Sequence, residues 1–196
     1  MNICVFGASS STIDTSFIDE TTQLGEKLAD RGHTLIYGAG ASGLMGAAAR
    51  GAYAKGGEII GVVPDFFVNE DMGVDGRLFD KCTELVLTDT MRERKYIMEE
   101  RADAFIVTPG GIGTFEEFFE VFTLKQLQRH SKAIAILNLN GYYNSMISLL
   151  EEAEKLRFVG KSCRDLIKIF TDIDEMLDYI ENYTPENITI FDAKNI

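Results

Sequence analysis

The fold is decided by the stretch AFIVTPGGIGTFEE at residues 104–117. It opens with four apolar residues, and the residues after the glycines continue in a helical pattern to about Arg129. We therefore expect a strand, a glycine turn and a helix. Because Gly110, Gly111 and Gly113 carry no side-chain bulk, backbone N–H groups of the turn can approach an anion. The unpaired N–H groups and the positive dipole end of the helix favour the same ligand.

Polar residues that could contact a ligand follow these glycines within one helical turn. Thr114 can add a hydroxyl, and Glu116 and Glu117 fall in the first helical turn. An ordinary glycine turn followed by acidic first-turn residues is the alternative. The threonine and the paired glutamates favour a phosphate site, with a carboxylate a few ångströms further along the ligand.

Length and composition predict a single domain spanning residues 1–196, because this length gives one full core. The net charge of −12 argues against a nucleic acid partner, which needs a basic face. No apolar run approaches membrane-spanning length, and we expect no signal peptide. Three scattered cysteines indicate free thiols and a cytoplasmic location. The two histidines, His33 and His130, fall near expected helix ends, where solvated or capping roles are expected. The sequence therefore offers few histidines for a zinc site or a Ser-His-Asp triad.

Apolar runs alternate with helical patterns along the whole chain. Expected strands lie at residues 3–6, 34–37, 59–63, 85–87, 104–107, 133–137 and, as an edge strand, 166–170. Expected helices lie at about residues 15–31, 47–52, 90–101, 112–129, 141–156 and 173–183, before a loosely held acidic tail. This pattern predicts an α/β, Rossmann-like three-layer sandwich, with a mostly parallel sheet covered by helices on both faces. Ligands of such folds bind beyond the carboxyl ends of the strands, so the loops at 7–11, 38–43, 64–76 and 109–114 should gather there.

A second glycine motif follows the second expected strand. Gly38, Gly40 and Gly43 satisfy the G-x-G-x-x-G pattern of dinucleotide-binding proteins. The pattern normally follows the first strand, however, and the expected acidic residue after the next strand is poorly placed. We interpret the loop as a second wall of the nucleotide site, and a nicotinamide-dependent dehydrogenase remains an alternative. Ser9, in the loop after the first strand, either faces a ligand or belongs to an ordinary turn.

Two helices carry further candidates. Arg94 shares a helix face with apolar residues, so it should point inward or along a cleft rim and meet an anionic partner. The helix after the glycine turn has one stripe of Phe115, Phe118, Phe119 and Phe122 and a roughly opposite stripe of Val121, Leu124 and Leu127, with Glu117 on the second side. Such a helix is covered on two sides, by the sheet and by either a second subunit or the rest of a monomer.

The irregular segment 65–81 is typical of a lid or binding loop.

The sequences MRERK at residues 91–95 and PGGIGTFEE at 109–117 together resemble the LOG family. Its members are cytokinin riboside 5′-monophosphate phosphoribohydrolases, long mislabelled as lysine decarboxylases. The family motif P-G-G-x-G-T-x-x-E is complete here and ends at Glu117. The resemblance spans about residues 2–155 and includes residues 37–40 and 43–46, leaving 156–196 as a C-terminal strand, helix and tail. Arg92, where plant members more often have His, and a longer segment at 65–81 are departures that bear on which base is recognised.

The resemblance implies hydrolysis of the N-glycosidic bond of a nucleoside 5′-monophosphate, either AMP or a cytokinin riboside 5′-monophosphate. It assigns catalysis to Arg94 and Glu117. The implied substrate-binding residues are Ser9, Gly43, Met45, Glu70, Lys95, Gly110, Gly111, Ile112, Gly113, Thr114 and Thr123. It further implies a homodimer with the active site near the interface, and no metal or organic cofactor. The alternative on the same fold is a nucleotide- or cofactor-binding carrier without turnover. A lysine decarboxylase is not favoured, because the sequence shows no framework of a pyridoxal-binding lysine with partners for the phosphate and ring of that cofactor.

Overall fold

The computed structural model describes residues 1–69, 78–185 and 188–194. Its strands are β1 Asn2–Phe6, β2 Thr34–Tyr37, β3 Ile59–Pro64, β4 Glu84–Thr88, β5 Ala104–Val107, β6 Ala133–Leu137 and β7 Lys168–Phe170. They form one seven-stranded sheet in the order β4-β3-β2-β1-β5-β6-β7, and every neighbouring pair is parallel. The predicted α/β fold is confirmed, with β7 at an edge as expected.

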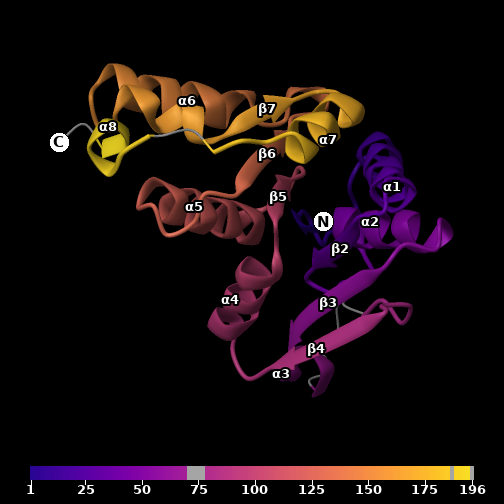
Figure 1. Cartoon of the computed structure of the whole chain (residues 1–196). Helices are drawn as coiled ribbons and strands as arrows, with labels where there is room; N and C mark the ends of the chain where they lie inside the picture. The colour runs from indigo at the N-terminus through magenta and orange to yellow at the C-terminus, as the bar shows by residue number, and fades with distance from the viewer. Residues whose placement is uncertain (70–77, 186–187, 195–196) are drawn as a thin grey trace.

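The helices are α1 Thr15–Asp30, α2 Gly43–Ala54, α3 Asp65–Asn69, α4 Met91–Arg101, α5 Ile112–Gln126, α6 Asn144–Lys155, α7 Ile173–Glu181 and α8 Ile190–Lys194, with 3₁₀ turns η1 Leu139–Gly141 and η2 Lys161–Leu166. Buried side chains of α1, α2 and α7 pack on one face of the sheet. Those of α4, α5, η2 and α8 pack on the other face. Figure 1 shows α1 and α2 on one side of the sheet and α4 and α5 on the opposite side. The three layers follow from continuously apolar strands that have to be covered on both faces.

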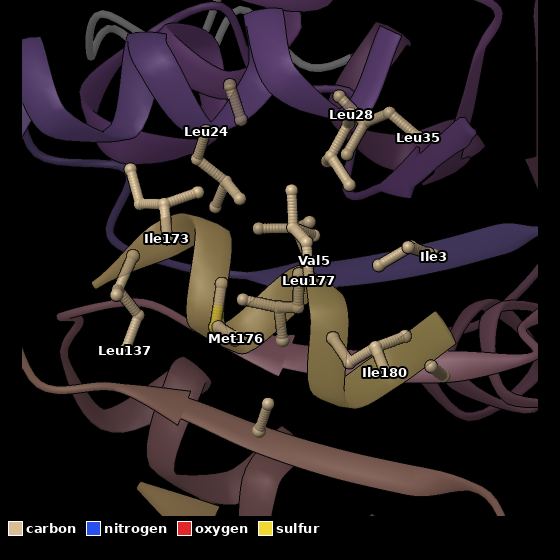
Figure 2. Close-up of a cluster of buried hydrophobic side chains, with 14 of the residues drawn as sticks. Ile3, Val5, Leu24, Leu28, Leu35, Leu137, Ile173, Met176, Leu177 and Ile180 are labelled. Atoms are coloured by element: carbon tan, nitrogen blue, oxygen red, sulfur yellow. The ribbon is translucent and has the colours of Figure 1, made fainter. Parts of the chain in front are cut away.

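The core is built from the alternation of side chains along each strand. In β1, Ile3 and Val5 face the layer of α1, α2 and α7, whereas Cys4 and Phe6 face the layer of α4 and α5. Figure 2 shows the first cluster, in which Val5 lies between leucines of α1 and the apolar face of α7. All four β1 side chains are almost completely buried, so this strand is fixed from both faces.

The strand order places a switch point between β1 and β5. From β1 the chain runs outward through β2 and β3 to β4, and α4 then returns it to β5 on the other side of β1. The loops that leave the carboxyl ends of β1 and β5 therefore diverge to opposite faces, which is where open α/β sheets form their ligand crevice. Helix α4 begins at a defined point because the Thr90 side chain accepts a hydrogen bond from Glu93 N.

Two loop regions differ from the sequence-based expectation. The segment 65–81 is not irregular throughout, since it opens with α3, and Leu78 forms an antiparallel bridge with Gly40. Helix α6 begins three residues later than expected, because Asn140 and Gly141 adopt left-handed φ angles of 51° and 72° within and at the end of η1.

Residues 188–194 are docked rather than loosely held. Ala193 of α8 is buried, and its carbonyl accepts hydrogen bonds from Gly160 N at 2.9 Å and Gln126 Nε2 at 3.1 Å. The expectation of a loose tail was wrong. Its acidic composition predicts that the side chains are solvated, but it does not predict whether the backbone carbonyl groups accept hydrogen bonds from the rest of the protein.

The division of α5 into two apolar sides was also wrong in detail. Its buried residues are Thr114, Glu117, Phe118, Val121, Phe122 and Lys125. They follow the i, i+3, i+4 spacing of one helix face, so aromatic and aliphatic residues share the side that packs on the sheet. Glu117 lies on this sheet-facing side, whereas Phe119 and Ile112 are exposed.

Both histidines lie before strands, at the amino edge of the sheet and away from the candidate site. Neither is solvated as expected. His33 is buried and its Nε2 contacts Glu181 Oε1 at 2.8 Å. His130 Nε2 donates to the carbonyl of Val121, and burial lowers the pKa of His130 to about 4. Within the described residues, no group of three or more His, Cys, Asp or Glu side chains is arranged to hold a metal.

Candidate active site

The candidate site lies at the carboxyl ends of β1, β2, β3 and β5. The loop after β1 and the glycine turn after β5 are joined directly, because Ala8 N donates a hydrogen bond to Pro109 O at 3.1 Å. The loop after β1 also meets α2, whose Met45 N donates to Ala8 O at 3.2 Å. The predicted gathering is confirmed for the loops after β1, β2 and β5, since a Cβ atom on Gly43 would also come within 2.4 Å of Ala8 O.

The central contact is a buried ion pair between α4 and α5. Arg94 Nη1 donates to Glu117 Oε1 at 2.9 Å, and the two residues are 7% and 9% exposed. Arg94 Nε also donates to Val62 O at 3.1 Å, at the end of β3. The guanidinium group is therefore held by a carboxylate on one side and a strand carbonyl on another. The expectation that Arg94 points inward and meets an anionic partner is confirmed.

Glu117 is in an environment suited to proton transfer. Burial raises the pKa of Glu117 above its ordinary value, and the neighbouring charge and hydrogen bond of Arg94 oppose that rise only in part. Among residues 1–69, 78–185 and 188–194, none hydrogen-bonds to the second carboxylate oxygen of Glu117. One oxygen therefore anchors the side chain to Arg94, and the other remains for a ligand or water.

The three glycines of the turn differ in their surroundings. A Cβ atom on Gly110 would lie 2.1 Å from Thr114 Oγ1, so this glycine is required by the packing of the turn itself. A Cβ atom on Gly111 or Gly113 would meet nothing within 4 Å, and neither glycine has a left-handed φ. No clash with the described residues therefore requires glycine at either position, although Gly111 is the N-cap of α5, where glycine is common. Space next to main-chain N–H groups at a helix start is what an anion requires.

The other glycine motif serves packing inside the protein. A Cβ atom on Gly38 would lie 2.1 Å from Arg94 Nη2, and one on Gly40 would lie 2.9 Å from Met45 Cε. Gly43 has a φ of +59°, and its Cβ would come within 2.4 Å of Ala8 O. Gly38 thus makes room for the guanidinium group, and Gly43 makes room for the loop after β1. The space that a dinucleotide pyrophosphate would need against Gly38 is occupied by Arg94.

Lys95 is directed to carboxylates of α5. Its Nζ forms ion pairs with Glu116 and, at 2.6 Å, with Glu120. The Lys95 side chain is 14% exposed, but that of Glu116 is 53% exposed, so these pairs lie at the protein surface, where they tie α4 to α5 beside the Arg94–Glu117 contact. The carboxylates of α5 thus compete with any ligand phosphate for this ammonium group.

The remaining predicted residues are spread around the site. Ser9 is exposed in the loop after β1, Met45 is half-buried over Gly38 and Gly40, and Ile112 is 82% exposed at the start of α5. Thr123 is exposed on α5, eleven residues beyond Ile112 and therefore about 16 Å further along the helix axis. Glu70 lies outside the described residues.

Sequence reasoning missed contacts made by Tyr142 and Tyr143. Their hydroxyl groups donate to Gly110 O at 2.5 Å and to Thr108 O at 2.7 Å, respectively. A pair of adjacent tyrosines just after a strand at the ligand edge is the only signal that points to them. The carbonyl of Val62 carries no sequence signal, because every residue has one.

We expect Gly38→Ala to lower the free energy of unfolding by about 1–3 kcal/mol, because its methyl group would overlap Arg94. In an Arg94→Ala background the same substitution should cost less than about 0.5 kcal/mol. Urea denaturation of the four proteins of this double-mutant cycle measures the coupling. Gly40→Ala, whose methyl group would meet only the flexible end of Met45, is the matched control and should cost the same in both backgrounds. An equal cost of Gly38→Ala in the two backgrounds would contradict this reading of the site.

Known proteins resemble this chain over most of its length. A family model described as "possible lysine decarboxylase" matches residues 45–180. The cytokinin riboside 5′-monophosphate phosphoribohydrolase LOG2 of Arabidopsis thaliana is 35% identical over 185 residues, which cover 94% of this chain and 84% of that protein. The probable cytokinin riboside 5′-monophosphate phosphoribohydrolase LOGL3 of Oryza sativa subsp. japonica is 36% identical over 182 residues, covering 93% and 84%.

Solved structures show the same fold at lower identity. The molybdenum cofactor binding protein of Rippkaea orientalis superposes with a TM-score of 0.68 at 19% identity, covering 92% of this chain and 94% of that one. This likeness concerns the fold alone. The family model and the plant relatives cover most of the sequence, and the family model includes residues 91–95 and 109–117. The chain therefore belongs to the LOG family of cytokinin riboside 5′-monophosphate phosphoribohydrolases.

Proposed function

We propose that the chain hydrolyses the N-glycosidic bond of a nucleoside 5′-monophosphate and releases the free base and ribose 5-phosphate. The observation that carries this proposal is the open space at Gly111 and Gly113, one helical turn from the buried Arg94–Glu117 pair. The names of the plant relatives supply the substrate class.

The spacing along α5 suits a ribose phosphate. In the proposal, the 5′-phosphate binds the main-chain N–H groups of residues 111–114 and the Thr114 hydroxyl. Glu117 follows Gly113 by four residues, which is about 6 Å along the helix axis. A ribose ring bridges such a distance, so its C1′ atom would come beside the carboxylate of Glu117.

The chemistry of Glu117 follows from this placement. As the bond from C1′ to the base nitrogen breaks, positive charge develops on the ribose, and a nearby carboxylate stabilises it. The same group accepts a proton from water as the water oxygen bonds to C1′. The departing base nitrogen takes up a proton from solvent, and Glu117 afterwards releases its own proton to solvent, so that one water molecule is consumed in total. A raised pKa of Glu117 brings its two protonation states closer in free energy, as this transfer requires.

Arg94 has a positioning and electrostatic role in this proposal. Its hydrogen bonds to Glu117 and to the Val62 carbonyl keep the carboxylate in one rotamer. Residues near Met45 and Ser9 would border the base or ribose, and the preferred base, adenine or an N6-modified adenine, depends on contacts that include the segment 65–81. The proposed reaction uses water and needs neither a metal nor an organic cofactor.

We also propose that the chain acts as a homodimer through the outer face of α5. Ile112, Phe119 and Thr123 are exposed there, at a spacing that puts them on one stripe. An exposed isoleucine and phenylalanine on one helix face indicate a covered surface. Thr123 is too far along α5 to reach the glycine turn of its own chain, so the family's binding role for this position fits a second copy.

The proposed location is the cytoplasm, because Cys4, Cys82 and Cys163 are all unpaired thiols. Among the described helices, none is long and apolar enough to span a membrane.

We expect Glu117→Gln to lower kcat by about 10²–10⁴-fold, because the amide can neither accept the proton nor balance the charge on the ribose. Nucleotide affinity should remain within a few-fold. Release of adenine from AMP and of base from a cytokinin riboside 5′-monophosphate, followed by chromatography, measures turnover. Unchanged turnover would remove Glu117 from the mechanism. If the unmodified chain binds nucleoside monophosphates tightly but cleaves none of them, it is a carrier and not a hydrolase.

Gly113→Ala should separate stability from binding. The residue is helical and its Cβ meets nothing in the protein, so alanine should raise the free energy of unfolding by up to about 1 kcal/mol. The same methyl group would occupy the space of the phosphate and weaken binding of ribose 5-phosphate at least about tenfold, or about 1.4 kcal/mol. Calorimetric titration and urea denaturation measure the two effects. A variant that binds as tightly as the unmodified chain would disprove the phosphate site at this turn.

Phe119→Glu should convert a dimer into a monomer, because it places a charge on the apolar stripe of α5. Light scattering coupled to size-exclusion chromatography gives the mass of each protein. Glu20→Gln, on the distant helix α1, removes one exposed charge and is the control. A monomeric mass for the unmodified chain, or an unchanged dimer for Phe119→Glu, would rule out this interface.

A further inference from the structure

Two adjacent tyrosines donate hydrogen bonds to the glycine turn and to the end of the strand before it. The Tyr142 hydroxyl donates to Gly110 O at 2.5 Å, and the Tyr143 hydroxyl donates to Thr108 O at 2.7 Å. Both tyrosines come from the chain that leaves β6, which is remote in sequence from residues 108–110. The proposed mechanism assigns neither of them a role.

The local structure fixes both rings. Asn138 is buried, its Oδ1 accepts from Tyr143 N at 2.7 Å, and its Nδ2 donates to Asn144 Oδ1 at 2.9 Å. The two tyrosine rings pack edge to face with centroids 5.0 Å apart. Phe17 of α1 packs against Tyr142 in the same way, at 6.3 Å. Tyr143 is thus held by buried contacts, whereas Tyr142 is 43% exposed and its ring is held by Phe17 on one side and Tyr143 on another.

The geometry of a peptide unit gives the Tyr142 contact a consequence. The carbonyl of Gly110 and the N–H of Gly111 belong to one planar trans peptide, so they point in opposite directions. A hydrogen bond that holds Gly110 O toward Tyr142 consequently holds the Gly111 N–H away from it. Among the described residues, none accepts a hydrogen bond from Gly111 N. Because this peptide joins two glycines, its backbone alone would allow other orientations.

The Tyr143 contact does not orient a backbone N–H group. The carbonyl of Thr108 shares its peptide unit with the nitrogen of Pro109, which carries no hydrogen. The Tyr143 bond satisfies a carbonyl at the end of β5 and is almost completely buried, since Tyr143 is 1% exposed. Tyr143 therefore supports the strand end, whereas Tyr142 controls the direction of an N–H group.

We propose that Tyr142 is a positioning residue for substrate phosphate: its hydroxyl fixes the Gly110–Gly111 peptide so that the Gly111 N–H points at the anion. The hydrogen bond also polarises this peptide and strengthens its N–H as a donor. The inference rests on the proposed function only in taking the 5′-phosphate of a nucleotide as the anion.

Tyr142→Phe tests the proposal because it keeps the ring and removes only the hydroxyl. We expect the Kd for ribose 5-phosphate to rise about tenfold. In the Glu117→Gln background, which slows turnover enough to measure binding, the Kd for AMP should rise equally, while the Kd for adenosine stays within about twofold. For turnover, KM for AMP should rise with kcat almost unchanged. Tyr143→Phe should lower stability with a smaller effect on phosphate affinity. Tyr53→Phe, an exposed tyrosine that packs on Phe79, is the control without effect.

Two results would overturn the proposal: an unchanged Kd for ribose 5-phosphate in Tyr142→Phe, or an equal loss of AMP and adenosine binding. The same loss of phosphate affinity in Tyr143→Phe as in Tyr142→Phe would overturn it as well, because the peptide argument predicts a difference. Failure of the proposed function is a separate result. If the chain binds ribose 5-phosphate but cleaves no nucleoside monophosphate, the proposed function fails, and the Kd values still test Tyr142. If the chain cleaves AMP and Tyr142→Phe leaves the Kd for ribose 5-phosphate unchanged, only the inference about Tyr142 fails.

Discussion

The structure at the carboxyl edge of the sheet depends on one buried ion pair, Arg94 with Glu117. It joins two helices that lie on the same face of the sheet but enter from β4 and β5, and the Val62 carbonyl binds it to β3 as well. Removing one member of a buried pair leaves an uncompensated charge, which costs about 3–5 kcal/mol. An intact buried pair, by contrast, is often no more stabilising than apolar residues of similar volume, so chemistry explains its place at a ligand edge better than stability does. The ion pairs of Lys95 with Glu116 and Glu120 hold the same two helices together at their outer side.

The glycines around this pair fall into two classes that the sequence alone does not separate. Gly38, Gly43 and Gly110 lack a side chain because protein atoms occupy the space, whereas Gly111 and Gly113 border open space. The first class shapes the site, and the second leaves room for a ligand. This division explains why the G-x-G-x-x-G pattern at residues 38–43 resembles a dinucleotide fingerprint without forming one, since Arg94 takes up the space beside its first glycine.

Sequence patterns predicted most of the fold and the central contact, because both depend on periodic features. Continuous apolar strands required a sheet covered on both faces, and a lone arginine on an apolar helix face required an anionic partner. Three kinds of feature were beyond reach. The docking of α8 depends on backbone hydrogen bonds. The sheet-facing orientation of Glu117 follows from residues of both expected apolar stripes packing on the sheet together. The tyrosine contacts join residues 32 and 35 positions apart through carbonyl groups.

The central claim is that bare main chain at residues 111–114 holds an anion and thereby sets a sugar carbon against Glu117. A crystal structure of the Glu117→Gln variant with AMP tests it most directly. The account predicts phosphoryl oxygens about 2.7–3.2 Å from the main-chain nitrogens of this turn, with C1′ beside residue 117. A phosphoryl group bound elsewhere, for example in the loop at 38–43 and remote from the start of α5, would contradict it.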